Sequence, residues 1–377
     1  LPSISDRTII TQRRTALAFF PAILYNKEDI AWRNRRLCIM EELDTIIKSI
    51  TDNLTGESQK DIKYLQGCIE LYRDHPLHRE ISRACSQLLY KLMPEESRQH
   101  FADLFSKAFE KFRKDLEEAR KRATAQDFDG ARKVLEPHLQ EAEHSALFQP
   151  DSEVEFRSFA EPMEMVVYRQ FFHPKKKIQQ APFPFHLLYL TLGELELAQG
   201  RTKAARKALE KGLKWDPASA PVRACYLAVL KEEEDWESFG RVNREAFRQA
   251  FRPKDLARCY QNEGILLLRR EDWQGARYAF LLSLNYGETE TVKAQLETAV
   301  QKLGKDLAPA SQEELTAFAE KQGIPLGPNV EILRLAAGGA QTCHQDGREK
   351  EAEYYLDVIR PFLSEKDMEG LKKKLGY

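Results

Sequence analysis

Few residues of this 377-residue chain are grouped as catalysis or metal binding would require. His75 and His78 stand three apart, a spacing that can bind a metal ion from one helix face. Pro76 between them indicates a helix start, however, so we do not expect the two imidazoles to share a face. Cys343 and His344 are adjacent, and neighbouring helical residues point about 100° apart. The sequence therefore predicts no metal site.

Motifs for catalysis and cofactor binding are missing from the sequence as well. It contains no HExxH, GxSxG, GxGxxG or P-loop pattern. We therefore expect no catalytic residue, no cofactor and no enzyme activity. An enzyme or enzyme subunit with an unfamiliar site is kept as an alternative.

One basic run could contact RNA. The run covers residues 175–177, and its aromatic neighbours could stack on single-stranded bases: Phe171, Phe172, Phe183 and Phe185. A solvated loop is the simpler interpretation. The whole chain has 58 basic and 59 acidic residues and a net charge of −1, so nucleic acid is unlikely as its main partner. RNA binding through this loop remains an alternative function.

Composition favours amphipathic helices in water, with 31% charged and 42% hydrophobic residues. The longest apolar run, Ala16 to Tyr25, contains Pro21 and is too short to cross a bilayer. Six isolated cysteines without a CxxC pair indicate buried thiols in a reducing compartment. We expect a cytoplasmic protein without membrane contact. Because the sequence begins at Leu1 rather than methionine, a targeting segment or further domain could precede it.

One helical-hairpin pattern occurs three times between His186 and Glu290. Its turns include Gly200, Asp235 and Asp272, and the matching positions 202, 236 and 273 are 34 and 37 residues apart. Small residues occupy the positions where paired helices would cross, and a larger one follows in each copy to fill the gap to the next hairpin. In the first and third copies these are Gly193, Ala205 and Leu209, and Gly264, Ala276 and Phe280. The second copy has the larger Leu227 and Phe239 at the small positions.

This pattern resembles the tetratricopeptide repeat (TPR), whose period is about 34 residues. The resemblance covers roughly residues 101–145 and 186–377. It implies an all-α, TPR-like superhelix of stacked helical hairpins, and we expect a bacterial member. It also implies a non-catalytic protein–protein interaction scaffold that holds a protein or peptide segment on its concave face, without specifying the partner.

Five regions are expected. They are an N-terminal helical cap (1–100), a TPR-like hairpin (101–149), an extended or β insertion with a loop (150–185), three TPR hairpins (186–290) and C-terminal helices with a last TPR-like hairpin (291–377). The cap should begin with a long helix over 28–54, and a helix with an N-terminal capping box should follow Ser311.

The insertion shows apolar residues alternating with polar ones around Pro162, at Val154, Phe156, Met163, Met165 and Val167. Alternation is typical of extended chain. We therefore predict a short β-hairpin or two extended arms.

The resemblance also predicts which side chains line the concave face, because the first helix of each TPR hairpin does so. The candidate partner-binding residues are Arg258, Gln261, Asn262, Arg269, Leu190, Glu194 and Lys231. Some TPR proteins clamp a terminal carboxylate with Lys and Asn. Here Leu190 and Glu194 stand in those places, which disfavours that clamp. Arg258 and Arg269 could still hold an acidic or carboxylate-bearing segment, since Arg makes planar bidentate contacts. A solvated helix face, or packing against the chain's own insertion, is the alternative.

A second class of function is also compatible with the resemblance. The chain could be a peptide-sensing signalling regulator whose N-terminal helical region is the effector. Residues 1–110 contain no recognisable helix-turn-helix, which counts against a DNA-binding version.

Overall fold

The computed structural model describes residues 41–145, 148–287, 289–304 and 310–377. These residues form helices and two short strands, so the predicted all-α class is confirmed. The chain divides into two compact units, Leu1–His100 and Phe101–Tyr377, and helix α4 (Glu95–Thr124) runs across the division.

The first unit packs a helix over 41–52 with α2 (Ser58–Leu71) and α3 (His78–Leu92). The side chain of the buried Asp61 accepts hydrogen bonds from the backbone N–H groups of Thr55 and Gly56, which fixes the turn between the first two helices. Of the helix predicted over 28–54, residues 28–40 lie outside the described residues. The core of this unit comprises Leu43, Ile50, Leu65, Cys68, Leu77, Ile81 and Cys85.

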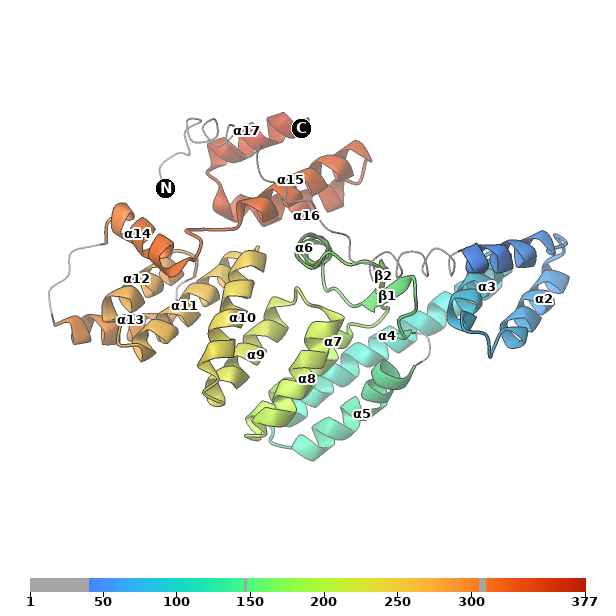
Figure 1. Cartoon of the computed structure of the whole chain (residues 1–377), viewed down its shortest axis with the longest axis horizontal. Helices are drawn as coiled ribbons and strands as arrows, with labels where there is room; N and C mark the ends of the chain where they lie inside the picture. The colour runs from blue at the N-terminus through green and yellow to red at the C-terminus, as the bar shows by residue number, and fades with distance from the viewer. Residues whose placement is uncertain (1–40, 146–147, 288, 305–309) are drawn as a thin grey trace, which may run out of the picture. The chain divides into compact units, whose positions relative to one another are not determined.

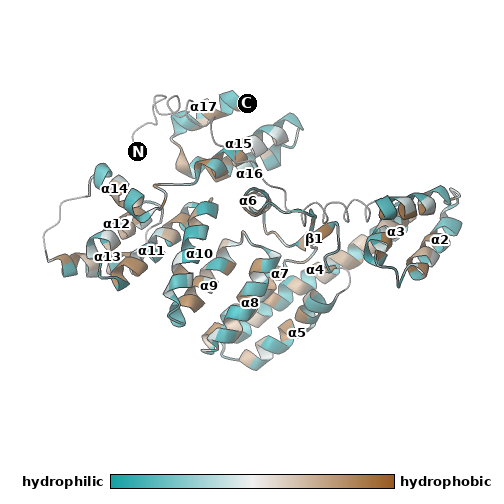
Figure 2. Cartoon of the chain, viewed as in Figure 1, coloured by the Kyte–Doolittle hydropathy of each residue, from teal (hydrophilic) through white to brown (hydrophobic). Residues whose placement is uncertain are grey.

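The second unit contains the repeats. After α4 come α5 (Phe128–His144), α7 (Phe185–Ala198), α8 (Thr202–Trp215), α9 (Ala220–Glu232), α10 (Trp236–Gln249), α11 (Pro253–Arg269) and α12 (Trp273–Leu284). Helices α7 to α12 lie side by side in sequence order (Figure 1). Most helices carry both hydrophobic and hydrophilic segments, as amphipathic helices do when each hairpin buries one face against the next (Figure 2).

Within the part of the chain that the structure describes, five helical hairpins share one type of turn. In each, a residue in the left-handed conformation ends the first helix: Gln126, Gly200, Glu234, Glu271 and Gly347, with φ between 55° and 72°. The backbone N–H of the next residue donates a hydrogen bond to the carbonyl five residues before it, as Asp272 does to Leu267. Three of the turns then use an aspartate to cap the second helix. This common geometry confirms that the turns predicted from the sequence are equivalent.

Small residues lie at the helix crossings, as predicted. A Cβ atom added to Gly193 would stand 2.6 Å from the side chain of Leu209, and one added to Gly264 would stand 2.4 Å from that of Phe280. Ala276 is completely buried. The two helices of each hairpin can approach this closely only because these side chains are small.

The insertion differs from the prediction. Its strands, β1 (Val154–Arg157) and β2 (Lys177–Gln180), pair in parallel, and α6 (Pro162–Phe172) connects them. The short extended segments predicted for the insertion are confirmed, but their pairing as a β-hairpin is wrong, because parallel strands need a crossover rather than a tight turn. Met163 and Val167 lie on the buried side of α6, not on an extended arm.

The C-terminal part contains α13 (Glu290–Leu303), α14 (Gln312–Gln322), the hairpin α15 (Val330–Gln345) and α16 (Glu349–Ile359), the 3₁₀ helix η2 (Arg360–Phe362) and α17 (Glu365–Leu375). The capping box of Ser311 and Glu314 is confirmed. Helix α6 packs into one core with α15 and α16. Within the described residues, no helix is both long and apolar enough to cross a membrane.

Candidate functional site

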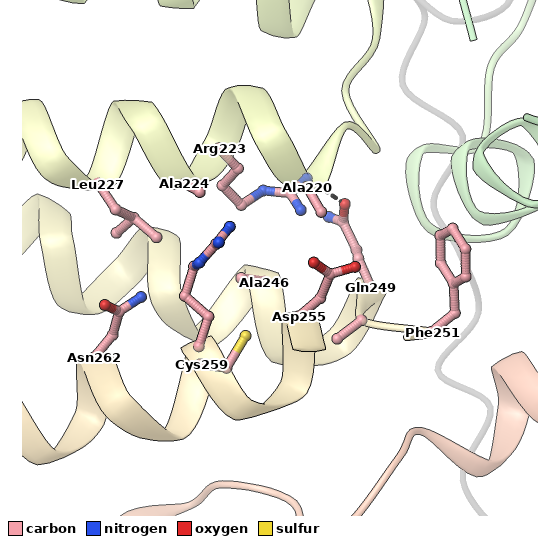
Figure 3. Close-up of a pocket in the computed structure, with 12 residues that line it drawn as sticks. Ala220, Arg223, Ala224, Leu227, Ala246, Gln249, Phe251, Asp255, Cys259 and Asn262 are labelled. Carbon is pink, nitrogen blue, oxygen red and sulfur yellow. Dashed lines mark hydrogen bonds between the residues drawn. The ribbon is translucent and has the colours of Figure 1, made fainter. Parts of the chain in front are cut away.

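A pocket lies between α9, α10 and α11, at the junction of two successive hairpins. The space between its lining residues is about 390 Å³ when open solvent is counted. Its walls are largely apolar, from Ala220, Ala224, Leu227, Ala246, Ala250 and Phe251. Its polar groups come from Arg223, Gln249, Asp255, Arg258, Cys259 and Asn262. Arg223, Gln249 and Asp255 reach into the same end, whereas Leu227 and Asn262 lie at the other (Figure 3).

Arg223 is the central cation of the pocket, and it is only 6% exposed. Its position follows from α9, which begins with Pro221 in its first turn and turns this side chain toward α10. One guanidinium nitrogen donates to the Pro217 carbonyl and to Gln249 Oε1, both uncharged acceptors. No carboxylate of the described part of the chain forms an ion pair with it. Burial lowers the pKa of Arg223, and the negative charges of Asp216, Glu245 and Asp255 oppose that shift.

Arg258 and Asp255 bring two further charges from the first turns of α11. Arg258 is exposed, whereas Asp255 is 8% exposed and stands where the positive end of the helix dipole favours a carboxylate. Burial raises the pKa of Asp255, and the positive charges of Arg252, Lys254 and Arg258 oppose that shift. With two arginines and one partly desolvated acid, the pocket carries a net positive charge.

Asn262 connects the pocket to the hairpin core. Its Nδ2 donates to Oδ1 of the buried Asn243 at 3.1 Å, and Asn243 Nδ2 donates to the Cys259 carbonyl at 3.0 Å. This network holds Asn262 in place beside the pocket. Burial raises the pKa of the Cys259 thiol to about 12, so this cysteine is a neutral wall residue rather than a nucleophile.

The other predicted groove residues lie elsewhere. Arg269 lines a different cavity at the far end of α11, and Gln261 donates to Gln295 of α13 at 3.0 Å. Leu190 is buried in the hairpin core. Glu194 lies 3.9 Å from Arg120, with a pKa that burial raises. The exposed Lys231, in the last turn of α9, does not line the pocket.

Sequence reasoning missed Arg223, Gln249 and Asp255. A single arginine in the otherwise apolar run from Ala220 to Leu230 was an available signal for Arg223. Gln249 belongs to the second helix of its hairpin, which the family pattern does not assign to the concave face.

The remaining reactive residues have partners within the protein. His75 Nδ1 accepts from the Leu77 N–H, and His344 Nδ1 lies 2.9 Å from Glu349 Oε1. Burial raises the pKa of Cys343.

The aromatic side chains near the basic run are mostly unavailable for base stacking. Phe183 and Phe185 are buried, and Phe171 lies beneath the guanidinium of Arg248, whereas Phe172 is 43% exposed. Lys176 Nζ donates to the Asp151 carbonyl at 2.5 Å, and Lys177 begins β2. The stacking surface expected for RNA is therefore largely absent from the described residues.

Comparison with known proteins gives little further guidance. No family model and no curated protein sequence matches the chain. Among solved structures, one titled as a functional characterization of Pseudomonas aeruginosa PilF is similar, with 16% sequence identity and a TM-score of 0.38. The match covers 70% of this chain and 98% of the other.

Proposed function

We propose that this helical-repeat protein is a non-catalytic scaffold that binds an acidic or carboxylate-bearing segment of a partner protein in the pocket between α9, α10 and α11. The observation that carries the proposal is the buried guanidinium of Arg223, whose hydrogen bonds go only to uncharged acceptors. A buried charge that no carboxylate contacts directly is costly, and a carboxylate from a partner would reduce that cost. Arg258 at the same pocket would supply a second planar donor.

The size and lining of the pocket favour a side chain or short segment over a large cofactor. The apolar walls of alanine, leucine and phenylalanine would contact the aliphatic part of the bound residue. Asn262, already held by Asn243, offers an amide to a neighbouring peptide group.

A serine–histidine pair at hydrogen-bond distance is inaccessible. Ser158 Oγ lies 3.0 Å from His186 Nδ1, but both residues are completely buried. Ser158 Oγ also accepts from the His186 backbone N–H at 3.1 Å, and burial lowers the pKa of His186 to about 4. A neutral, enclosed imidazole of this kind joins the insertion to the repeats and supports a non-catalytic function.

Selection from a random peptide library displayed on phage tests the proposal and does not require that the partner be identified. We expect peptides retained by the wild-type chain to be enriched in Asp and Glu. When the Arg258→Ala variant is the target of the selection, that enrichment should be lost. When the Lys254→Ala variant is the target, the enrichment should remain, since this variant removes an equal charge from α11 outside the pocket. No acidic enrichment with the wild type, or equal enrichment with Arg258→Ala, would overturn the proposal.

A further inference from the structure

A second cavity lies at the far end of α11 from Arg258. It lies between the first half of α10 and the last turn of α11, and the space between its lining residues is about 880 Å³ when open solvent is counted. Three arginines line it, Arg244 from α10 and Arg269 and Arg270 from the end of α11, with Trp236 and Leu266 as its apolar part. Glu237 is its one acidic lining residue.

The three guanidinium groups are poorly neutralised by their surroundings. Arg269 stacks 4.7 Å from the centre of the Trp236 ring, and its Nη2 lies 3.9 Å from Glu234 Oε2. Those two charged side chains are 51% and 72% exposed, so solvent screens the pair. Across the described ranges, neither Arg244 nor Arg270 has a carboxylate within ion-pair distance. Burial raises the pKa of Glu263, and the positive charges of Arg244 and Arg270 oppose that shift from a longer distance.

Hydrogen-bond donors greatly outnumber acceptors in this cavity. Besides the arginines, the indole Nε1 of Trp236 is buried without a hydrogen-bond partner among the described residues. Arg244 Nη2 lies 4.0 Å from the position that a Cβ atom on Gly240 would occupy. The guanidinium of Arg244 therefore lies along α10 beside Gly240, one helical turn from Trp236. A ligand that satisfies these groups must bring several oxygen acceptors and more than one negative charge.

We propose that this second cavity binds a phosphate monoester dianion. Three arginines and one glutamate give the lining a formal charge of +2, and a phosphate monoester carries about −1.5 to −2 at neutral pH. Its three terminal oxygens accept from guanidinium groups that approach from two helices. A carboxylate, with a single charge and two oxygens, would leave donors unpaired. The Trp236 ring and Leu266 contact the organic part of the ester.

Calorimetric titration of the full chain at low ionic strength tests this site. The probes are glycerol 2-phosphate, a glycine-serine peptide with one phosphoserine, and the same peptide unphosphorylated. We expect both phosphate probes, or the phosphopeptide alone, to bind and to perturb tryptophan fluorescence. Binding of the peptide alone identifies a phosphorylated protein as the source, whereas binding of both shows that a small monoester is sufficient.

Arg244→Gln should weaken binding at least tenfold. Arg241→Gln, which removes the same charge from α10 outside the cavity, should change it less than twofold. Arg270→Gln serves as a second variant in case Arg244→Gln fails to fold. The proposal is overturned if neither phosphate probe binds, if the unphosphorylated peptide binds equally well, or if Arg241→Gln is as damaging as Arg244→Gln. Arg258→Ala should leave this binding unchanged, so failure here and failure of the proposed function are distinguishable.

Discussion

Single side chains determine both how closely the helices pack and what charge the pocket carries. The sequence predicted the first of these well, because a glycine or alanine at a regular position has few explanations other than close approach. It predicted the second poorly. The family pattern pointed to Arg258 and Asn262, which line the pocket, but not to Arg223, because its importance depends on burial and on hydrogen bonds that go only to uncharged acceptors.

Gly264→Ala should destabilise the protein by about 1–3 kcal/mol, because its Cβ would overlap the Phe280 ring. Ala276→Leu, at the same crossing, should do the same. Gly338→Ala is the control: nothing lies within 4 Å of its added Cβ, and alanine should stabilise helix α15 by about 0.5–1 kcal/mol. Urea unfolding measures all three. Equal stability of the Gly264 and Gly338 variants would mean that the assigned crossing is wrong.

Two buried carboxyl groups should make stability depend on pH. Asp216 is completely buried and Glu164 is 4% exposed. Burial raises the pKa of each, and the negative charge of Glu164 raises that of Asp216 further. Arg223 faces Asp216, and Glu161 and Arg252 face Glu164. A raised folded-state pKa contributes stability that is fully present below about pH 4 and is lost as pH rises through the folded pKa.

Asp216→Asn should therefore reduce the loss of unfolding free energy between pH 5 and pH 9. The difference between wild type and variant should approach about 1.4 kcal/mol for each pH unit over which the pair holds its extra proton. Comparison with the wild type cancels the opposite contribution of His186, whose lowered pKa makes stability rise between about pH 4 and 6.5. Parallel stability curves for the two proteins would show that the pair does not share a proton.

At the scale of elements, the turns were predictable and the insertion was not. An aspartate before an aromatic residue marked three of the turns, and the structure adds a left-handed residue just before each. In the insertion, Met163 and Val167 fit period two, but they are also four residues apart, the spacing of a helix face. Pro162 stands in the first turn of α6, a position that favours a helix start. The Glu164 side chain also accepts hydrogen bonds from the backbone N–H groups of Ala160 and Glu161, which stabilises the start of this helix.

Glu271→Gly should stabilise the third repeat hairpin by about 1 kcal/mol, because a non-glycine residue is strained at its φ of 58°. The same substitution at Glu245, in the middle of α10, should cost about 1 kcal/mol. Thermal unfolding of both variants measures the two signs. A loss of stability in Glu271→Gly would contradict the assigned turn geometry.

At the scale of the whole second unit, the insertion connects the repeats to the C-terminal hairpin. Glu161, just before α6, pairs with Arg252 at the start of α11 and accepts a hydrogen bond from the Tyr354 hydroxyl of α16 at 2.9 Å. Met163 and Phe251 share one core with α15 and α16. No local sequence pattern predicts such a connection, because its members are up to 193 residues apart.

Tyr354→Phe should loosen this connection while leaving the repeats intact. The variant removes the bonds to Glu161 and to the Met163 N–H but keeps the aromatic ring in the core. Hydrogen exchange should become faster in α6, α15 and α16 and stay unchanged in α7 to α10. Uniform acceleration throughout the unit, or none, would show that α6 does not hold the C-terminal hairpin.

The most direct test of the scaffold function is the affinity of an acidic peptide, obtained by phage selection on the wild-type chain, for wild type and Arg223→Met. Methionine fills similar space without a charge, so we expect the variant to melt at or above the wild-type temperature, because it no longer buries a cation that no carboxylate contacts directly. Its affinity for the peptide should fall at least tenfold, while Lys254→Ala stays within twofold of wild type. A folded Arg223→Met protein that binds the peptide as tightly as wild type would contradict the proposed scaffold function of this pocket.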